Sequence, residues 1–172
     1  MPVNEARAAA EDRGLQIMVS GLLQPFDPEE IVRMIEALHG DVSPELLKLL
    51  RGVGGGCSLG VGSPESGWSE VDILSPREIV GRTVEFRNVL TSRDSHASTS
   101  IVIFADYFGG GDVCFTRRVA GGKYPVFAGD HDSMREWESD QNPIADNAWS
   151  WAMQMFSYFI SGGRDFVYWA PD

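Results

Sequence analysis

The sequence predicts a fold that contains both helices and β-strands, and three observations support this expectation. Two capped helices occupy residues 25–40 and 42–56, near the start of the chain. Short apolar runs separated by turn residues follow from Cys57 onward, and an amphipathic helix closes the pattern at residues 147–163. A chain of 172 residues with 43% hydrophobic content is long enough to bury a core as one globular domain.

Both early helices begin with a polar cap that is followed by proline. Asp27 and Ser43 are suitable N-cap residues, because their side chains accept hydrogen bonds from free backbone N–H groups. Pro28 and Pro44 then fit the first helical position, where an N–H is not needed. The apolar residues that follow recur at helical spacing and predict a buried stripe on each helix. They are Ile31, Met34, Ile35 and Leu38 in the first helix, and Leu46, Leu47, Leu49 and Leu50 in the second.

The middle of the chain is typical of short strands joined by turns. We expect strands that start at Cys57 and lie near 71–74, and then at 101–107, 113–118 and 124–129. Between them we expect a capped helical turn at Ser75 and Pro76, a separate segment at 84–86 and a polar loop at 92–100. In the last helix, Ala148, Ala152, Met155, Phe156, Phe159 and Ile160 can share one face, and core packing is favoured over a ligand pocket.

Two glycine clusters, at residues 52–62 and 109–111, raise the question of a phosphate-binding loop. A P-loop needs a lysine followed by Ser or Thr, and no lysine lies near either cluster. A dinucleotide fingerprint needs glycines that lead into a helix, whereas Gly109 to Gly111 lead into an apolar strand-like run. We therefore interpret the second cluster as a hairpin turn.

Candidate catalytic and metal-binding residues are few and scattered. Cys57 and Cys114 show no metal-ligand spacing and are interpreted as buried free thiols. His131 and Asp132 form a His-Asp pair, but His39 and His96 are not spaced as further ligands. Four aspartates could imitate a cation site without matching a known spacing, and turn chemistry explains most of them. They are Asp106, Asp112, Asp130 and Asp132. We expect no catalysis, no metal and no cofactor.

The charge of the chain limits the classes of partner. A formal net charge of −11 and a pI of about 4.6 disfavour nucleic acid and anionic membrane surfaces, and favour a basic protein partner.

The N-terminal residues 1–14 carry acids and no apolar core, unlike a secretory signal, and the following run LQIMVSGLL is too short to span a bilayer. We expect a cytoplasmic protein.

The order of motifs along residues 27 to 161 resembles the SUKH superfamily, the Smi/Knr-like domain. The second helix of that family ends in a glycine-rich turn, as Val42, Ser43, Pro44, Leu47 and Leu50 lead into Gly54, Gly55 and Gly56 here. Its central strand and its later motifs are similar to further residues of this chain. These are Ile101, Ile103, Ala105, Asp106, Gly109 to Gly111, Asp112, Cys114 and Phe115, then Pro125, Val126 and Phe127, then Asp130 and His131, and finally Met155, Phe156, Phe159 and Ile160.

The resemblance implies an α+β fold in which a mixed, mainly antiparallel sheet packs against helices. It implies one SUKH-like domain over residues 1–172, with an N-terminal extension at 1–26 and a C-terminal tail at 164–172. Many members of this family are immunity proteins against bacterial polymorphic toxins. The resemblance therefore implies a partner-binding face and no catalytic residues.

Two acidic stretches that contain tryptophan are candidate partner-binding faces. An acidic rim steers a basic protein, and an exposed aromatic side chain can anchor it. The first candidate face consists of Asp130, Asp132, Glu136, Trp137, Glu138 and Asp140. The second consists of Glu65, Trp68 and Glu70, with Asp72 beside them. The alternative for the first stretch is an ordinary solubilising surface with Trp137 packed inward.

Three functions remain open at this point. An immunity protein binds one toxin domain tightly, and a basic nuclease toxin fits the charge, because nucleases hold phosphates. An intracellular scaffold of the same fold contacts several partners more weakly. A small metal-dependent hydrolase needs convergent carboxylates, and the scattered histidines count against it.

Overall fold

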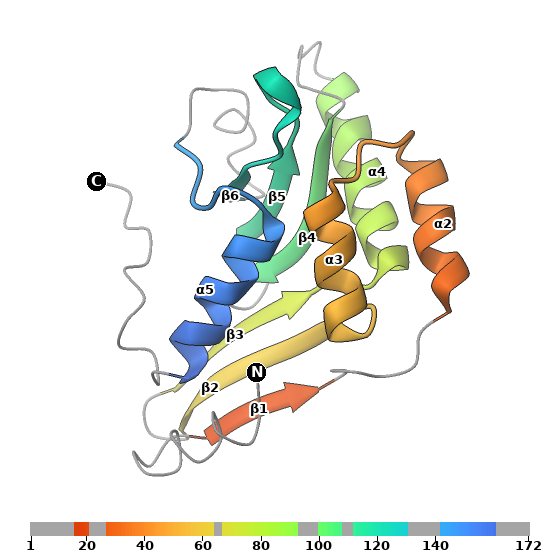
Figure 1. Ribbon diagram of the computed structural model, residues 1–172. Helices are drawn as coiled ribbons and strands as arrows, with labels where there is room; N and C mark the ends of the chain where they lie inside the picture. The colour runs from red at the N-terminus through yellow and green to blue at the C-terminus, as the bar shows by residue number, and fades with distance from the viewer. Residues whose placement is uncertain are drawn as a thin grey trace.

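The computed structural model describes residues 16–20, 27–63, 67–92, 100–107, 112–130 and 142–160 (Figure 1). Six strands form one sheet in the order β1-β2-β3-β4-β5-β6, and all neighbouring strands pair antiparallel. This confirms the predicted α+β class and its mainly antiparallel sheet. The elements are β1 (Gln16–Ser20), α2 (Pro28–Ala37), α3 (Pro44–Val53), β2 (Cys57–Ser63), β3 (Gly67–Ile73), α4 (Pro76–Ser92), β4 (Ile101–Tyr107), β5 (Asp112–Arg117), η1 (Ala120–Gly122), β6 (Val126–Asp130) and α5 (Ala148–Ile160).

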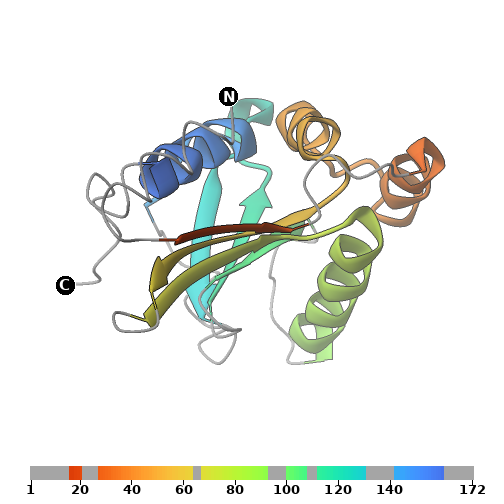
Figure 2. The same ribbon diagram turned by 90° about the horizontal axis from the view of Figure 1, so that it is seen from below.

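The helices lie on both sides of the sheet. Figure 2 shows α5, α3 and α2 on one side and α4 on the other. Helix α3 packs against α5, and α2 packs against α4. In the core between α5 and the sheet, the rings of Phe104 and Trp151 meet edge to face with centroids 5.0 Å apart, and both side chains are fully buried. Among the described residues, no helix is long and apolar enough to cross a bilayer.

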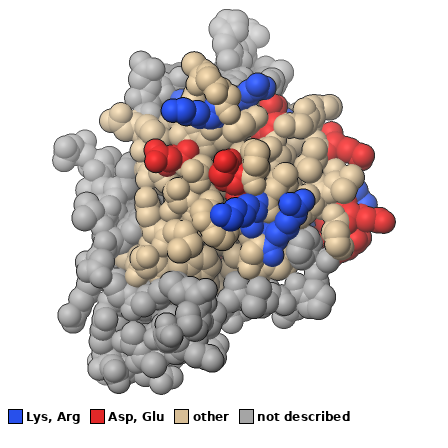
Figure 3. All heavy atoms as spheres, viewed as in Figure 1, with Lys and Arg blue, Asp and Glu red and all other residues tan. Residues whose placement is uncertain are grey.

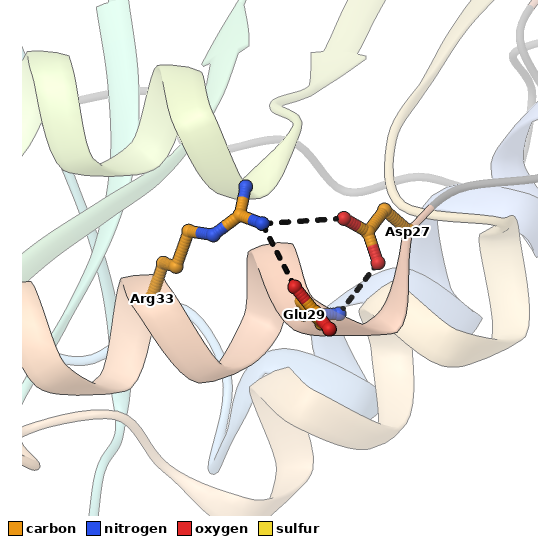
Figure 4. A network of polar contacts seen from close by, with 3 residues as sticks. All are labelled: Asp27, Glu29 and Arg33. Atoms are coloured by element: carbon orange, nitrogen blue, oxygen red, sulfur yellow. Dashed lines mark hydrogen bonds and ion pairs between the residues drawn. The ribbon is translucent and has the colours of Figure 1, made fainter.

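Helices α2 and α3 begin as predicted. The carboxylate of Asp27 accepts a hydrogen bond from the Glu29 N–H at 2.9 Å, and the Ser43 hydroxyl oxygen accepts one from the Leu46 N–H at 3.0 Å. Arg33 also reaches back to Asp27 and Glu29, at 3.5 and 3.0 Å (Figure 4). The two hydrogen bonds to the Asp27 and Ser43 side chains satisfy backbone N–H groups that would otherwise lack a partner at each helix start.

The predicted apolar stripes of the three amphipathic helices face the core. Most of their residues are buried, and Ile35, Leu47 and Phe156 are half-buried. The buried members are Ile31, Met34 and Leu38, then Leu46, Leu49 and Leu50, and then Ala148, Ala152, Met155 and Phe159. The core-packing interpretation of α5 is therefore confirmed.

The three predicted strands of the second half are confirmed as β4, β5 and β6. The run after the second glycine cluster enters β5 and pairs with β4, as a hairpin requires, although Gly109 to Gly111 lie outside the described residues. One extra residue interrupts this pairing: Ile103 pairs with Phe115, Ala105 pairs with the next residue Cys114, and Phe104 bulges between them.

Helix α4 corrects the prediction for the region after Ser75. The sequence favoured one helical turn followed by a separate segment at 84–86, but a single helix of 17 residues runs through this region. Its buried stripe is Ile79, Thr83 and Phe86. A threonine in the middle of that stripe and the helix-disfavouring Gly81 hide the helical period in the sequence.

Strand β1 was not predicted as a strand. It lies within the segment 1–26 that was assigned to an N-terminal extension, and it forms one edge of the sheet beside β2. Its pairing runs without interruption from Gln16 opposite Gly62 to Ser20 opposite Ser58.

Helix α4 covers an open edge in the middle of the sheet. Strand β3 pairs with residues 105–107 of β4, and the Leu74 N–H donates to the Phe104 carbonyl at 2.9 Å; among the described residues no strand lies beside Ile101 to Ile103 on that side. Instead, the Ile103 N–H donates to the Thr83 hydroxyl oxygen at 3.1 Å, and the Arg87 Nε donates to the Ile101 carbonyl at 3.1 Å. Side chains of α4 thus replace the ladder bonds that a strand would make.

Replacement of Thr83 tests this edge contact. Thr83→Val keeps the shape but removes the acceptor, so the buried Ile103 N–H loses its partner. We expect the free energy of unfolding to fall by about 1 to 3 kcal/mol. Thr83→Ser keeps the hydroxyl and is the control. Urea denaturation followed by circular dichroism measures both, and equal stability of the two variants would contradict the role of the hydroxyl.

Two glycines give opposite predictions for substitution by alanine. At Gly56, where φ is +155°, a Cβ would lie 2.9 Å from the backbone nitrogen of Ser75, so Gly56→Ala forces the chain apart at the start of α4. At Gly81, inside α4, a Cβ would meet nothing within 4 Å. We expect Gly81→Ala to raise the free energy of unfolding by about 0.5 to 1 kcal/mol, and with it the melting temperature. Gly56→Ala should lower the melting temperature. Calorimetry showing the reverse order would contradict this packing.

Candidate protein-binding site

The structure does not test the first predicted face. Asp132, Glu136, Trp137, Glu138 and Asp140 lie outside the described residues, as does Glu65 of the second face. For the remaining predicted residues the structure gives backbone positions in strands: Asp130 ends β6, opposite Asp112, and Trp68 and Glu70 lie in β3, opposite Gly62 and Gly60. The role of these residues stays a prediction.

A different acidic feature lies beside β3 and β4. A groove of about 420 Å³ opens between α4 and the ends of these strands, and we call it the α4 groove. Three carboxylates and one guanidinium are among the described residues that line it. The lining residues are Leu74, Glu78, Gly81, Arg82, Glu85 and Asp106. Asp72 belongs to the same region, because it lies directly opposite Asp106 in the β3–β4 pairing.

Asp106 is the most deeply placed carboxylate of the groove. Its side chain is only 14% exposed, and its Oδ2 lies 2.8 Å from the Nη2 of Arg82, which is itself 53% exposed. The other oxygen, Oδ1, is buried and has no hydrogen-bond partner among the described residues. A buried carboxylate oxygen without a donor is uncommon and costs free energy, so Asp106 retains the capacity to accept a further hydrogen bond.

The pairing of Asp72 with Asp106 places two negative charges next to each other. Directly opposite residues of an antiparallel pair project from the same face of the sheet, and like charges in these positions repel. Arg82 is the one cation that lines the groove in the described part of the chain. The region therefore keeps a surplus of negative charge at neutral pH.

Glu78 contributes both to the groove and to the start of α4. Its Oε2 accepts hydrogen bonds from the Ser75 hydroxyl at 2.6 Å and from the Ser75 N–H at 2.9 Å, while the Glu78 N–H donates back to the Ser75 oxygen at 3.4 Å. This is a capping box. The hydrogen bonds from Ser75, with a smaller contribution from the charge of Arg82, lower the pKa of Glu78 below its ordinary value.

The described thiols are unsuited to nucleophilic chemistry. Cys57 and Cys114 are both buried thiols outside any disulfide, as predicted. Burial, and secondarily the negative charge of Asp72, raises the pKa of Cys57 to about 12, so its thiolate is scarcely populated at neutral pH. In the described part of the chain, no three His, Cys, Asp or Glu side chains gather as a metal site would require.

Of the four aspartates that turn chemistry was expected mostly to explain, Asp106 is the exception, and Asp132 lies outside the described residues. Asp106 lies in β4 and binds Arg82, Asp112 is the first residue of β5, and Asp130 is the last residue of β6. Sequence reasoning also missed Arg82 and Glu85, because it did not predict the helix that carries them. The capping-box spacing of Ser75 and Glu78 was the available signal for that helix.

The face of the molecule seen in Figure 1 is not uniformly acidic in its described part. Figure 3 shows Lys and Arg side chains interspersed with Asp and Glu side chains over this face. One of the basic side chains on α3, Lys48, lies 4.0 Å from the centre of the Trp149 ring of α5, which makes it part of the helix packing.

Comparison with known proteins identifies no family. A scan against protein-family models gave no match, and a search of curated proteins gave none either. The resemblance to the SUKH superfamily thus depends on the order of short motifs alone.

The capping box predicts a pH dependence that Glu78→Gln removes. Because folding lowers the pKa of Glu78, its ionised form stabilises the folded state above the ordinary glutamate pKa, and this contribution disappears as the pH falls through the lowered value. We expect wild type to exceed Glu78→Gln in stability at pH 7, by less than about 1 kcal/mol because the side chain is exposed. The difference should shrink in denaturation curves as the pH falls below the ordinary pKa of glutamate and on through the lowered value. A difference that is constant with pH would contradict the ionised cap.

Proposed function

We propose that this protein is a non-catalytic binding domain for a basic protein, and that the α4 groove is one of its contact points. One observation carries the proposal: the carboxylate of Asp106, opposite Asp72, is largely buried, paired with a single exposed arginine, and keeps one oxygen without a described donor. A site with surplus negative charge and a free acceptor is suited to a cationic side chain. The net charge of −11 supports the same class of partner, since it attracts basic proteins at long range.

The finer proposal is an immunity protein that acts in the cytoplasm and neutralises a cognate toxin. The order of SUKH-like motifs supports it, as does the fit between an acidic surface and the basic surface of a nuclease toxin. In this proposal the two acidic stretches predicted from sequence, including Glu136 and Glu138 in the first and Glu70 in the second, are further candidate contacts for the same partner. A scaffold with several weaker partners is the alternative for the same surface.

Charge reversal on two helices tests the proposal. We expect Glu85→Lys, in the groove, to weaken capture of a basic partner by at least about tenfold, since it places a cation beside the cation-binding site. Glu36→Lys makes the same change of charge on the exposed side of α2 and is the matched control. The measurement is co-purification of the tagged protein from its native host at two salt concentrations, followed by titration with the purified partner.

The outcome of this comparison separates the functions. One basic partner that is lost with Glu85→Lys and retained with Glu36→Lys would support an inhibitor that binds through the groove. Loss with a Glu136→Lys, Glu138→Lys double variant alone would move the contact to the first predicted face. Equal loss with Glu36→Lys and Glu85→Lys would contradict a defined site on α4.

A further inference from the structure

We infer that Arg82 is an internal competitor for the α4 groove: it occupies Asp106 in the free protein, and an arginine of the partner displaces it. This inference rests on the proposed function, because it assigns the occupant and the regulation of the same groove. It begins from the asymmetry of the Arg82–Asp106 ion pair, in which the acid is 14% exposed and the base 53% exposed.

Arg82 is placed to leave its carboxylate easily. The structure shows one contact to Asp106, from Nη2 to Oδ2 at 2.8 Å, and the side chain reaches it from the exposed side of α4. Because the side chain of Arg82 is 53% exposed, water can solvate the released guanidinium, while the largely buried Asp106 needs another donor in its place. The space beside the neighbouring Gly81 is open, because even a Cβ added there would have no atom within 4 Å. This position therefore does not obstruct the outward movement of Arg82.

Asp106, in contrast, stays in place and stays incompletely bonded. It is held in β4 by the backbone pairing with Asp72 and Val113 on either side. Its Oδ1 has no described donor while Oδ2 holds Arg82. Because Oδ1 is buried, the Asp106 carboxylate rotates as Arg82 leaves; an incoming guanidinium can then donate to both carboxylate oxygens at once, which the single contact from Arg82 does not. Displacement of Arg82 therefore replaces a hydrogen bond to one carboxylate oxygen with hydrogen bonds to both.

The same geometry favours arginine over lysine as the incoming side chain. The guanidinium has a planar fork of N–H donors that matches the two oxygens of a carboxylate, whereas the ammonium of lysine acts as a point charge. Glu85 and Asp72 lie next to Asp106 and supply negative charge for the displaced and the incoming cation. The inference is thus specific in chemistry: a partner arginine enters, and Arg82 turns outward.

A titration with short peptides tests the inference on the full chain. The probes are acetyl-Gly-Arg-Gly-amide and the corresponding lysine peptide, and the readout is the shift of backbone amide signals of Gly81, Glu85 and Asp106 by nuclear magnetic resonance. Arg82→Gln should bind the arginine peptide about two- to fivefold more tightly than wild type, since the competitor is gone. The lysine peptide should gain less.

Arg33→Gln is the matched control for charge. It removes the same charge from α2, where Arg33 pairs with Asp27 and Glu29 (Figure 4), and it should leave the affinity at the groove unchanged. Arg82→Lys keeps the charge but loses the fork, and it should fall between wild type and Arg82→Gln. Asp106→Asn should abolish the shifts in the groove.

Three results would overturn the inference, and they are distinguishable. If wild type binds the arginine peptide in the groove and Arg82→Gln binds no more tightly than Arg33→Gln, Arg82 is not a competitor, while the proposed function stands. If Arg82→Gln binds more weakly, Arg82 helps to form the site instead. If the peptide shifts no groove amide in any variant, the groove does not take a cationic side chain, and the groove's part in the proposed function fails with the inference.

Discussion

The contact between α4 and the open edge of β4 is the constraint on which the rest of the structure depends. A β-sheet that loses a strand partway along leaves backbone donors and acceptors exposed to the core, and burial of such groups without partners is costly. Here a helix closes the gap with a threonine hydroxyl and an arginine, at Ile103 and Ile101. Arg87 also lies 3.7 Å from Asp41, which follows α2, so the same side chain ties a second helix to the sheet.

This arrangement also determines where the groove can form. Once Thr83 is fixed against β4, the residue before it, Arg82, is held near the strand end that carries Asp106. The register of β3 then brings Asp72 opposite that aspartate. The charges of the groove therefore follow from the way in which the sheet edge is completed. A fold requirement and a binding capacity share one helix, which is why stability and affinity must be measured separately in each variant of α4.

Much of the fold could be predicted because its signals are local. Caps such as Asp27 and Ser43 and the apolar periods of α2, α3 and α5 can be read within a window of a few turns. The length of α4 was hidden because Thr83 is buried for its hydroxyl rather than for apolar bulk, and its purpose is visible only against β4. The groove was hidden for a related reason: Asp72 and Asp106 meet through strand register, and Arg82 reaches Asp106 through the position of α4 beside β4, neither of which a sequence window contains.

The bulge at Phe104 has a consequence for how the length of this chain can vary. It lets Phe104 reach Trp151 of α5, while the pairing resumes at Ala105 and Cys114. Ile103 and Ala105 pair with the adjacent residues Phe115 and Cys114 and therefore already point to opposite faces of the sheet, so deletion of Phe104 alone would leave a regular ladder with the other side chains on their present faces. That deletion would still remove a fully buried ring from the core, and deletion of any other residue within β4 would turn the residues on one side of it to the opposite face. Insertions and deletions should accumulate in the connections between strands, and β4 should keep its length wherever this architecture occurs.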